Sequence, residues 1–206
     1  MIQSLLFDTL PESVEIDGAE YKIGYGYRTL MAIEIEMFSD NNDEQKLLNA
    51  LNLFYLNRIP RNRAKAVELM LWFHRCGEPE RKGEGRQRKV RRSYCFKQDA
   101  PLFYAAFLQQ YGLDLKRTRS CELHWWEFSA LFAGLDENTK LAKVMYWRTC
   151  NLNTLPKEQR KFVQKMRKLY EIHQPESDMD SQTKLARRNA EMMEYVRKRM
   201  EECQKE

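Results

Sequence analysis

Apolar residues recur along most of this chain at intervals of three and four positions, which is the spacing of one face of an α-helix. Segments bounded by glycine, proline or polar clusters follow this period and are predicted as helices over residues 27–38, 43–56, 64–76, 100–111, 122–135 and 157–172. Residues 137–149 fit a helix or a turn, and residues 181–206 fit a highly charged helix with a narrow apolar stripe. The pattern predicts a mainly α protein, a bundle of about six or seven helices.

One stretch near the start, residues 13–23, alternates apolar and polar residues instead and predicts a small N-terminal β-hairpin. Asp17 and Gly18 supply the pair of residues that a type I′ turn needs. Pairing about this turn would set Glu15 opposite Glu20. Because like charges that face each other are mildly unfavourable, the register stays open.

The chain is expected to divide after residue 172. Residues 1–172 would form the helical domain, which includes the hairpin 13–23 and a basic loop over 77–92. Residues 173–206 begin with the polar stretch HQPESDMD and are expected to form a linker plus a C-terminal charged amphipathic helix. That helix either docks on a partner or a second copy, or remains a frayed tail, because its stripe is too narrow to require burial. Docking would use Met192, Val196 and Met200.

The net charge of +5 is concentrated in two stretches. Residues 81–92 hold seven basic residues and one glutamate, and residues 157–168 hold six basic residues and one glutamate, so the rest of the chain is mildly acidic. The first stretch is either a solvated loop or an electrostatic contact with a partner. The contact residues would be Arg86, Arg88, Lys89, Arg91 and Arg92. Nucleic-acid binding by this loop is a weaker alternative, because only Tyr94 and Phe96 lie near enough to stack on bases.

The stretch ELHWWEFSALFAGL, residues 122–135, places His124 and Glu127 around two adjacent tryptophans. At about 100° per residue, Trp125 and Trp126 point to different faces, and both faces continue with apolar residues. A helix that is apolar on two opposed faces must be covered on both, so it is predicted to be the central element of the bundle. His124 and Glu127 would lie in the seam between these faces, where a half-buried, satisfied pair explains them better than a catalytic dyad.

Two further helices have clear local signals. Asp99 is placed to cap the helix 100–111, which tolerates Pro101 in its first turn and ends at Gly112. In the helix 157–172 the apolar residues form one stripe, which predicts a surface helix packed on the core through that stripe. The stripe consists of Phe162, Met166, Leu169 and Tyr170.

The motifs supply no catalytic chemistry. No phosphate-binding glycine loop, serine-hydrolase elbow or zinc-protease motif occurs, and the C-x-x-H pair of Cys121 and His124 lacks the second pair that structural zinc needs. We therefore expect a non-enzymatic protein with no catalytic residues, no cofactor and no metal. Five scattered cysteines fit reduced thiols, and no apolar run reaches the roughly 18 residues of a membrane span, so a cytoplasmic protein is expected.

Several longer motifs resemble one bacteriophage family. They are LMLWFHRCG (69–77), YCFKQDAPLFYAAFLQQYGLDL (94–115) and LHWWEFSALFAGLDENTKLAKVMYWR (123–148), preceded by LPESVEIDGAEYKI (10–23). The chain is similar over residues 5–172 to the tail-region family labelled bacteriophage gene product fifteen.

The resemblance implies a role in tail assembly. Genes of this family typically lie between the tail tube gene and the tape-measure gene of long-tailed phages and prophages, the position of tail assembly chaperones. The implied function is a non-enzymatic chaperone in the host cytoplasm that binds the helical tape-measure protein before the tail tube polymerises. Other tail assembly chaperones, the tail tube protein and further copies of the chain are additional candidate partners. A structural tail component or adaptor in the virion, or a nucleic-acid-binding module that uses residues 81–92, are the alternatives.

Overall fold

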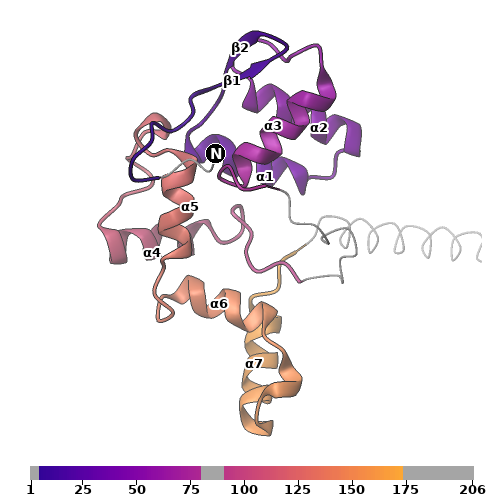
Figure 1. Cartoon of the computed structure of the whole chain (residues 1–206). Coiled ribbons are helices and arrows are strands. Elements are labelled where there is room, and N and C mark those ends of the chain that lie inside the picture. Colours follow the sequence, from indigo (N-terminus) through magenta and orange to yellow (C-terminus); the bar gives the residue numbers. More distant parts are fainter. Residues whose placement is uncertain (1–4, 80–90, 174–206) are drawn as a thin grey trace, which may run out of the picture. The chain divides into compact units, whose positions relative to one another are not determined.

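The computed structural model describes residues 5–79 and 91–173, and the chain up to Ile172 clusters as one compact unit. Within the described residues it holds seven α-helices and one two-stranded sheet (Figure 1), which confirms the predicted mainly helical fold with a small hairpin. The predicted helix 181–206 and most of the predicted basic loop 77–92 lie outside the described residues. The elements are β1 (Ser13–Ile16), β2 (Ala19–Lys22), α1 (Tyr27–Met37), α2 (Asp43–Phe54), α3 (Arg63–His74), α4 (Ala100–Tyr111), η1 (Ser120–Glu122), α5 (Trp125–Ala133), α6 (Lys140–Thr149), η2 (Leu152–Thr154) and α7 (Lys157–Leu169).

The hairpin β1–β2 turns at Asp17 and Gly18, whose φ angles of 52° and 74° suit the predicted type I′ turn. The two strands pair antiparallel, and Glu15 does lie opposite Glu20. Both glutamate side chains are exposed, so water screens their repulsion, while Val14 on the other face is buried. The burial of this apolar face, rather than the cross-strand charge pair, is what fixes the register.

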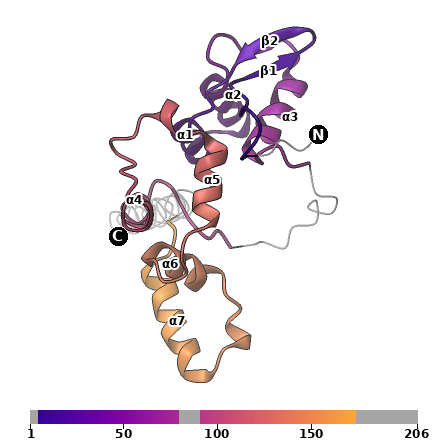
Figure 2. The same cartoon turned by 60° about the vertical axis from the view of Figure 1, so that its left-hand side comes forward.

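The main packing contacts between the helices fall into two groups within this unit. Helix α1 packs against α2 and α5, α4 packs against α6, and α6 packs against α7. Both views place the hairpin beside α2 and α3, with α6 and α7 at the other end of the unit (Figures 1 and 2). In the part of the chain that the structure describes, no helix combines the length and the apolar content that crossing a bilayer requires.

Phe128 of α5 occupies the middle of an aromatic core and is fully buried. Its ring stacks on Phe107 of α4 at 4.9 Å between centroids, on Trp125 at 5.5 Å and on Tyr27 of α1 at 5.6 Å. Such aromatic pairs add stability beyond the area they bury. Helix α5 therefore joins α1 to α4, as expected of a central element.

The second predicted apolar face of α5 is only partly covered, and this part of the prediction is wrong. Trp126 is buried, but Ala130 and Ala133, on the same side of the helix, are exposed. The hydrogen bonds from α5 to α3 come from Trp125 and Trp126, both in the first turn of this nine-residue helix. Small alanine side chains leave little apolar area in water, so the open side costs little free energy.

A buried ion pair connects α4 to α6. The guanidinium of Arg148 donates to both carboxylate oxygens of Asp99, with Nη2 and Oδ1 2.8 Å apart, and the two side chains are 4% and 3% exposed. The same guanidinium donates to the carbonyl oxygens of Ser93 at 3.0 Å and Tyr170 at 2.7 Å. Asp99 does precede α4 as predicted, but its carboxylate binds Arg148 and the N–H of Cys95 instead of capping the helix.

Candidate partner-binding surface

His124 and Glu127, which flank the two tryptophans in the sequence, form the N-terminal cap of α5. The N–H of His124 donates to the Glu127 carboxylate over 2.8 Å, and His124 Nδ1 accepts from the N–H of Trp126 over 3.1 Å. This reciprocal arrangement is a capping box in which an imidazole replaces the usual hydroxyl. The predicted mid-helix seam is wrong because α5 begins at Trp125, one residue after His124.

The ring of His124 is occupied on both nitrogens. Because Nδ1 accepts a hydrogen bond, the proton of the neutral ring lies on Nε2, which donates to the carbonyl of Pro11 over 3.2 Å. Burial lowers the pKa of His124, and the Pro11 carbonyl and the Glu127 carboxylate offset only part of this effect. The ring therefore positions α5 against the N-terminal segment and presents no free nitrogen to a substrate or a metal.

The adjacent tryptophans complete the C-terminal end of α3. Nε1 of Trp126 donates to the carbonyl of Phe73 over 2.9 Å, and Nε1 of Trp125 donates to the carbonyl of His74 over 3.0 Å. These carbonyls belong to the last turn of α3, where the helix itself offers no donors. The expectation that the two rings serve opposed faces is therefore incomplete, since both indoles also reach the same helix end.

The end of the basic stretch 81–92 that the structure describes is partly engaged by the domain. The guanidinium carbon of Arg92 lies 3.3 Å from the centroid of the Phe38 ring, and Nη2 lies 4.0 Å from a Glu34 carboxylate oxygen. Arg91 is exposed. The other predicted contact residues lie outside the described residues, so their role stays a prediction; these are Arg86, Arg88, Lys89, Met192, Val196 and Met200.

Helix α7 contacts the domain through one side. Val163 is the buried residue of this helix, and Arg167 donates to the carbonyls of Trp147 at 2.9 Å and Cys150 at 2.7 Å. Arg160 donates to the carbonyl of Leu155 at 3.2 Å. Arg167 thus attaches α7 to the end of α6, and Arg160 attaches it to the segment between the two helices.

The apolar stripe predicted to pack α7 on the core does so only in part. Met166 and Tyr170 are half-buried, and the Tyr170 ring centroid lies 5.8 Å from that of Trp147. The side chains of Phe162 and Leu169 are 53% and 67% exposed. The Phe162 ring meets the Trp147 ring edge-on, with centroids 6.0 Å apart. The helix is attached in addition by Val163 and the two arginines, which lie to one side of the predicted stripe.

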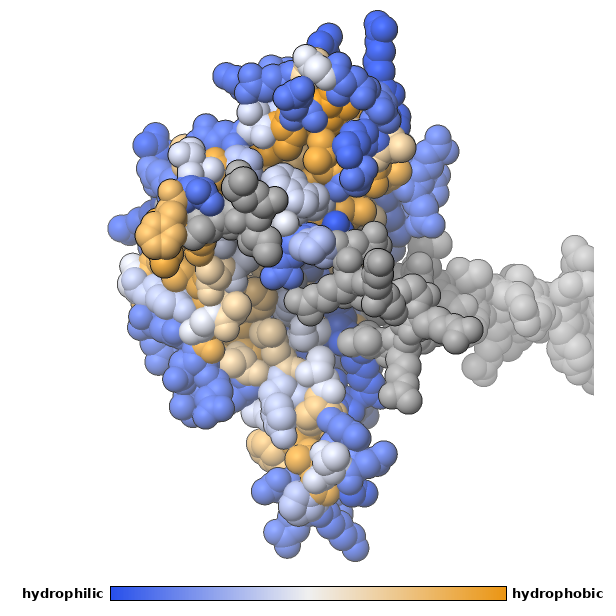
Figure 3. Space-filling model, viewed as in Figure 1, coloured by the Kyte–Doolittle hydropathy of each residue, from blue (hydrophilic) through white to orange (hydrophobic). Residues whose placement is uncertain are grey.

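Four lysines form a solvent-facing row along α7, which we call the lysine row. They are Lys157, Lys161, Lys165 and Lys168, all exposed and without an ion-pair partner among the described residues. Spacings of four, four and three residues place them within about 80° of arc and along about 16 Å of helix. Phe162 and Leu169 lie along one edge of the row. Figure 3 shows hydrophilic residues over this end of the molecule with a smaller hydrophobic group beside them.

The charge of the described residues is divided between two regions. Residues 140–173 contain nine basic and two acidic residues, whereas residues 5–79 contain twelve acidic and eight basic residues. A row of cations beside exposed apolar side chains matches the charged and apolar faces of an acidic amphipathic helix. The sequence shows that residues 157–168 are basic. The spacing of the lysines in this segment was the signal that could have placed them on a different side of the helix from the arginines.

Among the described residues, no three His, Cys, Asp or Glu side chains converge in an arrangement that could hold a metal ion.

Residues 6–172 match the model of a protein family described as Bacteriophage Gp15 protein. No curated protein and no solved structure matches the chain significantly.

Proposed function

The chain belongs to the bacteriophage Gp15 family, and from this membership we propose that it is a non-enzymatic tail assembly factor that acts in the host cytoplasm. Its partner would be the helical tape-measure protein, which it would keep soluble until tail tube subunits assemble around it. Assignment of the chain to a phage family rests on the match over residues 6–172. The proposal of a tape-measure partner is supported by the position of genes of this family in the tail region and by the surface of α7.

The lysine row is the observation that carries this proposal. A long helical partner needs a binder that accepts many similar segments, and a charged row beside two apolar side chains demands little exact fit. Each contact between exposed charges contributes about 0.2–1 kcal/mol, so a single site would bind weakly. Several copies along one partner would then bind tightly through avidity. Binding of this kind suits a chaperone, because the tail tube must later displace it.

Co-expression with the long helical tail protein encoded next downstream tests the proposal. We expect the partner to stay soluble with this chain and to copurify with it. The variant Lys161→Glu/Lys165→Glu turns two attractions of the row into repulsions and should weaken binding about tenfold or more. The matched control is Lys97→Glu/Lys116→Glu, which makes the same charge change at two exposed lysines outside α7.

Equal loss of binding in both variants would contradict a specific role of the lysine row. If the partner stays insoluble with the native chain and no complex forms, the chaperone proposal fails. A structural tail component is the second candidate, favoured by the same family membership, and it would be found in finished particles from which an assembly factor is absent. Protein analysis of purified virions separates the two.

A further inference from the structure

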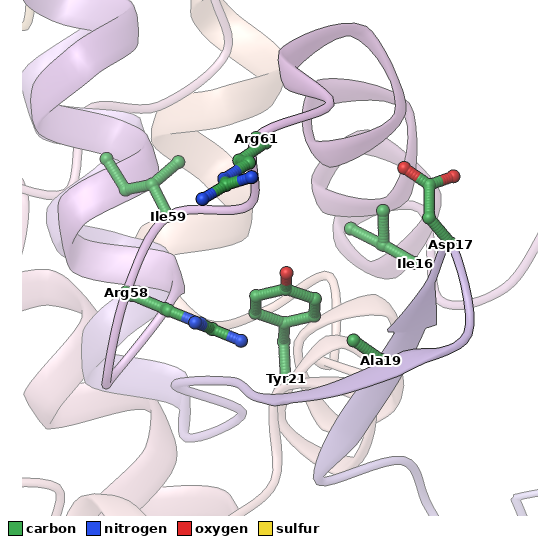
Figure 4. A pocket seen from close by; sticks show the side chains of 7 residues that line it. All are labelled: Ile16, Asp17, Ala19, Tyr21, Arg58, Ile59 and Arg61. Carbon is green, nitrogen blue, oxygen red and sulfur yellow. The ribbon is translucent and has the colours of Figure 1, made fainter.

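Between the hairpin and the loop that follows α2 lies a hollow of about 400 Å³, which we call the Tyr21 hollow. Figure 4 shows the Tyr21 ring standing in it, with the hydroxyl directed toward its open space. Arg58 and Arg61 come from the loop on one side, and Ile16 and Ala19 come from the hairpin on the other. Two cations and an aromatic ring therefore share one concave surface with apolar side chains.

The walls of the Tyr21 hollow are fixed by contacts outside it. The Tyr21 ring meets the buried Tyr55 ring edge-on at 6.1 Å, and the Tyr55 hydroxyl donates to the carbonyl of Ala66 over 2.9 Å. The loop is tied to the end of β2, because the N–H of Leu56 donates to the carbonyl of Lys22 over 3.1 Å. The hollow is thus formed before any ligand binds, which lowers the entropy cost of binding.

The charges in the Tyr21 hollow leave one positive charge unmatched. Neither Arg58 nor Arg61 has an ion-pair partner in the part of the chain that the structure describes, and the Arg58 guanidinium lies 5.6 Å from the Tyr21 centroid. The third charged group, the Asp17 carboxylate, lies 3.3 Å from the side-chain amide of Asn62. Two guanidinium groups and one carboxylate give the lining of the hollow a net charge of +1.

We propose that the Tyr21 hollow binds a single carboxylate that adjoins an apolar group. The planar guanidinium groups pair with carboxylates through two parallel hydrogen bonds, and the Tyr21 ring with Ile16 and Ile59 would cover the apolar part. A phosphate ester carries about two negative charges and would be repelled by Asp17, so the charge balance favours the carboxylate. A polypeptide offers this chemistry at an apolar chain end or at an acidic side chain beside an apolar one. The inference does not depend on the tape-measure proposal.

Titration of the full-length, ¹⁵N-labelled chain with 3-phenylpropionate near pH 7 tests the site by NMR. We expect saturable shifts of the backbone signals of Ile16, Ala19 and Ile59. The neutral analogue 3-phenylpropionamide should bind at least about fivefold more weakly, because it lacks the charge that the guanidinium groups pair with. Phenyl phosphate should also bind more weakly than 3-phenylpropionate. No saturable shift at these residues, or equal binding of the amide, would overturn the proposal, and tighter binding of phenyl phosphate would assign the site to phosphates instead.

Two variants and one matched control locate the binding. Arg58→Gln and Arg61→Gln should each weaken binding of 3-phenylpropionate about fivefold or more. Arg63→Gln makes the same charge change at an exposed residue that does not line the hollow, and it should leave the affinity unchanged. Equal weakening by all three would show general charge attraction rather than a site. A short peptide ending in phenylalanine, compared as free acid and as C-terminal amide, then distinguishes a chain end from an acidic side chain as the ligand. A site for chain ends should bind the free acid and not the amide.

Discussion

Replacing Arg148 should remove a large part of this protein's stability. In Arg148→Met the Asp99 carboxylate stays buried and keeps its hydrogen bond from the N–H of Cys95, while the carbonyls of Ser93 and Tyr170 lose the guanidinium as a donor. Breaking a buried ion pair by removing one partner costs about 3–5 kcal/mol, because it leaves an uncompensated charge in the interior. A domain of this size is stable by about 5–15 kcal/mol, so the loss would be a large fraction of the total.

Urea unfolding followed by tryptophan fluorescence and far-UV circular dichroism measures this loss at neutral pH. The double variant Asp99→Asn/Arg148→Met removes the stranded charge, and the introduced asparagine retains a side-chain oxygen for the N–H of Cys95. We therefore expect the double variant to be more stable than the sum of the single variants allows, by about 2 kcal/mol or more.

Arg167→Met is the matched control for Arg148→Met. Arg167 also donates to two carbonyl groups, of Trp147 and Cys150, but no carboxylate among the described residues accepts from it. Its replacement should cost about 1–2 kcal/mol, the free energy of such hydrogen bonds. A loss in Arg148→Met no larger than that in Arg167→Met would contradict this role of the buried ion pair. So would a double variant whose loss equals the sum of the losses in Asp99→Asn and Arg148→Met.

Three further changes test the arrangement around α5. Gly26→Ala should destabilise the folded protein strongly, since an added Cβ would overlap the carbonyl oxygen and the hydroxyl of Ser120. Its melting temperature should lie well below that of the wild type. An unchanged melting temperature would show that this contact relaxes freely. Trp126→Phe should lose about 1–3 kcal/mol in urea unfolding, because the Phe73 carbonyl loses its indole donor and the smaller ring leaves space; a loss below about 0.5 kcal/mol would contradict this role of the indole. In the wild type the pKa of His124 is lowered in the folded state, so the unfolded chain takes up a proton first as the pH falls below about 6.5. The wild type should therefore lose stability between neutral and mildly acid pH. His124→Gln should flatten this pH dependence of stability. An unchanged pH profile in this variant would show that His124 does not titrate differently on folding.

The elements that the sequence predicted well are those whose signals are local. Helix α4 carries Phe103 and Phe107 at a spacing of four and ends at Gly112, whose φ of 66° is the left-handed conformation that glycine adopts easily. The turn at Asp17 and Gly18 is equally local. In both cases the neighbouring residues along the chain determine the conformation, so a period or a dipeptide is sufficient evidence.

Features that depend on contacts between distant segments were missed. Arg148 lies in a helix whose polar residues would normally face water, and nothing along the chain reveals that Asp99, 49 positions earlier, pairs with it. The cap formed by His124 and Glu127 had a signal, a polar residue followed three positions later by a glutamate, but the pattern usually begins with serine or threonine. In α7, apolar periodicity identified only part of the attached face, because two arginines also hold the helix to the domain by hydrogen bonds to carbonyls outside the helix.

In α6 and α7 the arginines named above stabilise the fold, whereas the lysines of the lysine row form the candidate partner-binding surface. The arginines at 148, 160 and 167 all donate to backbone carbonyls, which suits a planar group with several fixed donors. The four lysines of the lysine row make no ion pair with the rest of the described chain, and an ammonium group left in water adds little to stability. Four like charges along about 16 Å of helix repel one another slightly, so the fold alone does not account for them. A partner that supplies carboxylates would remove that repulsion, and this is why charge reversal within the row should change binding while leaving the domain folded.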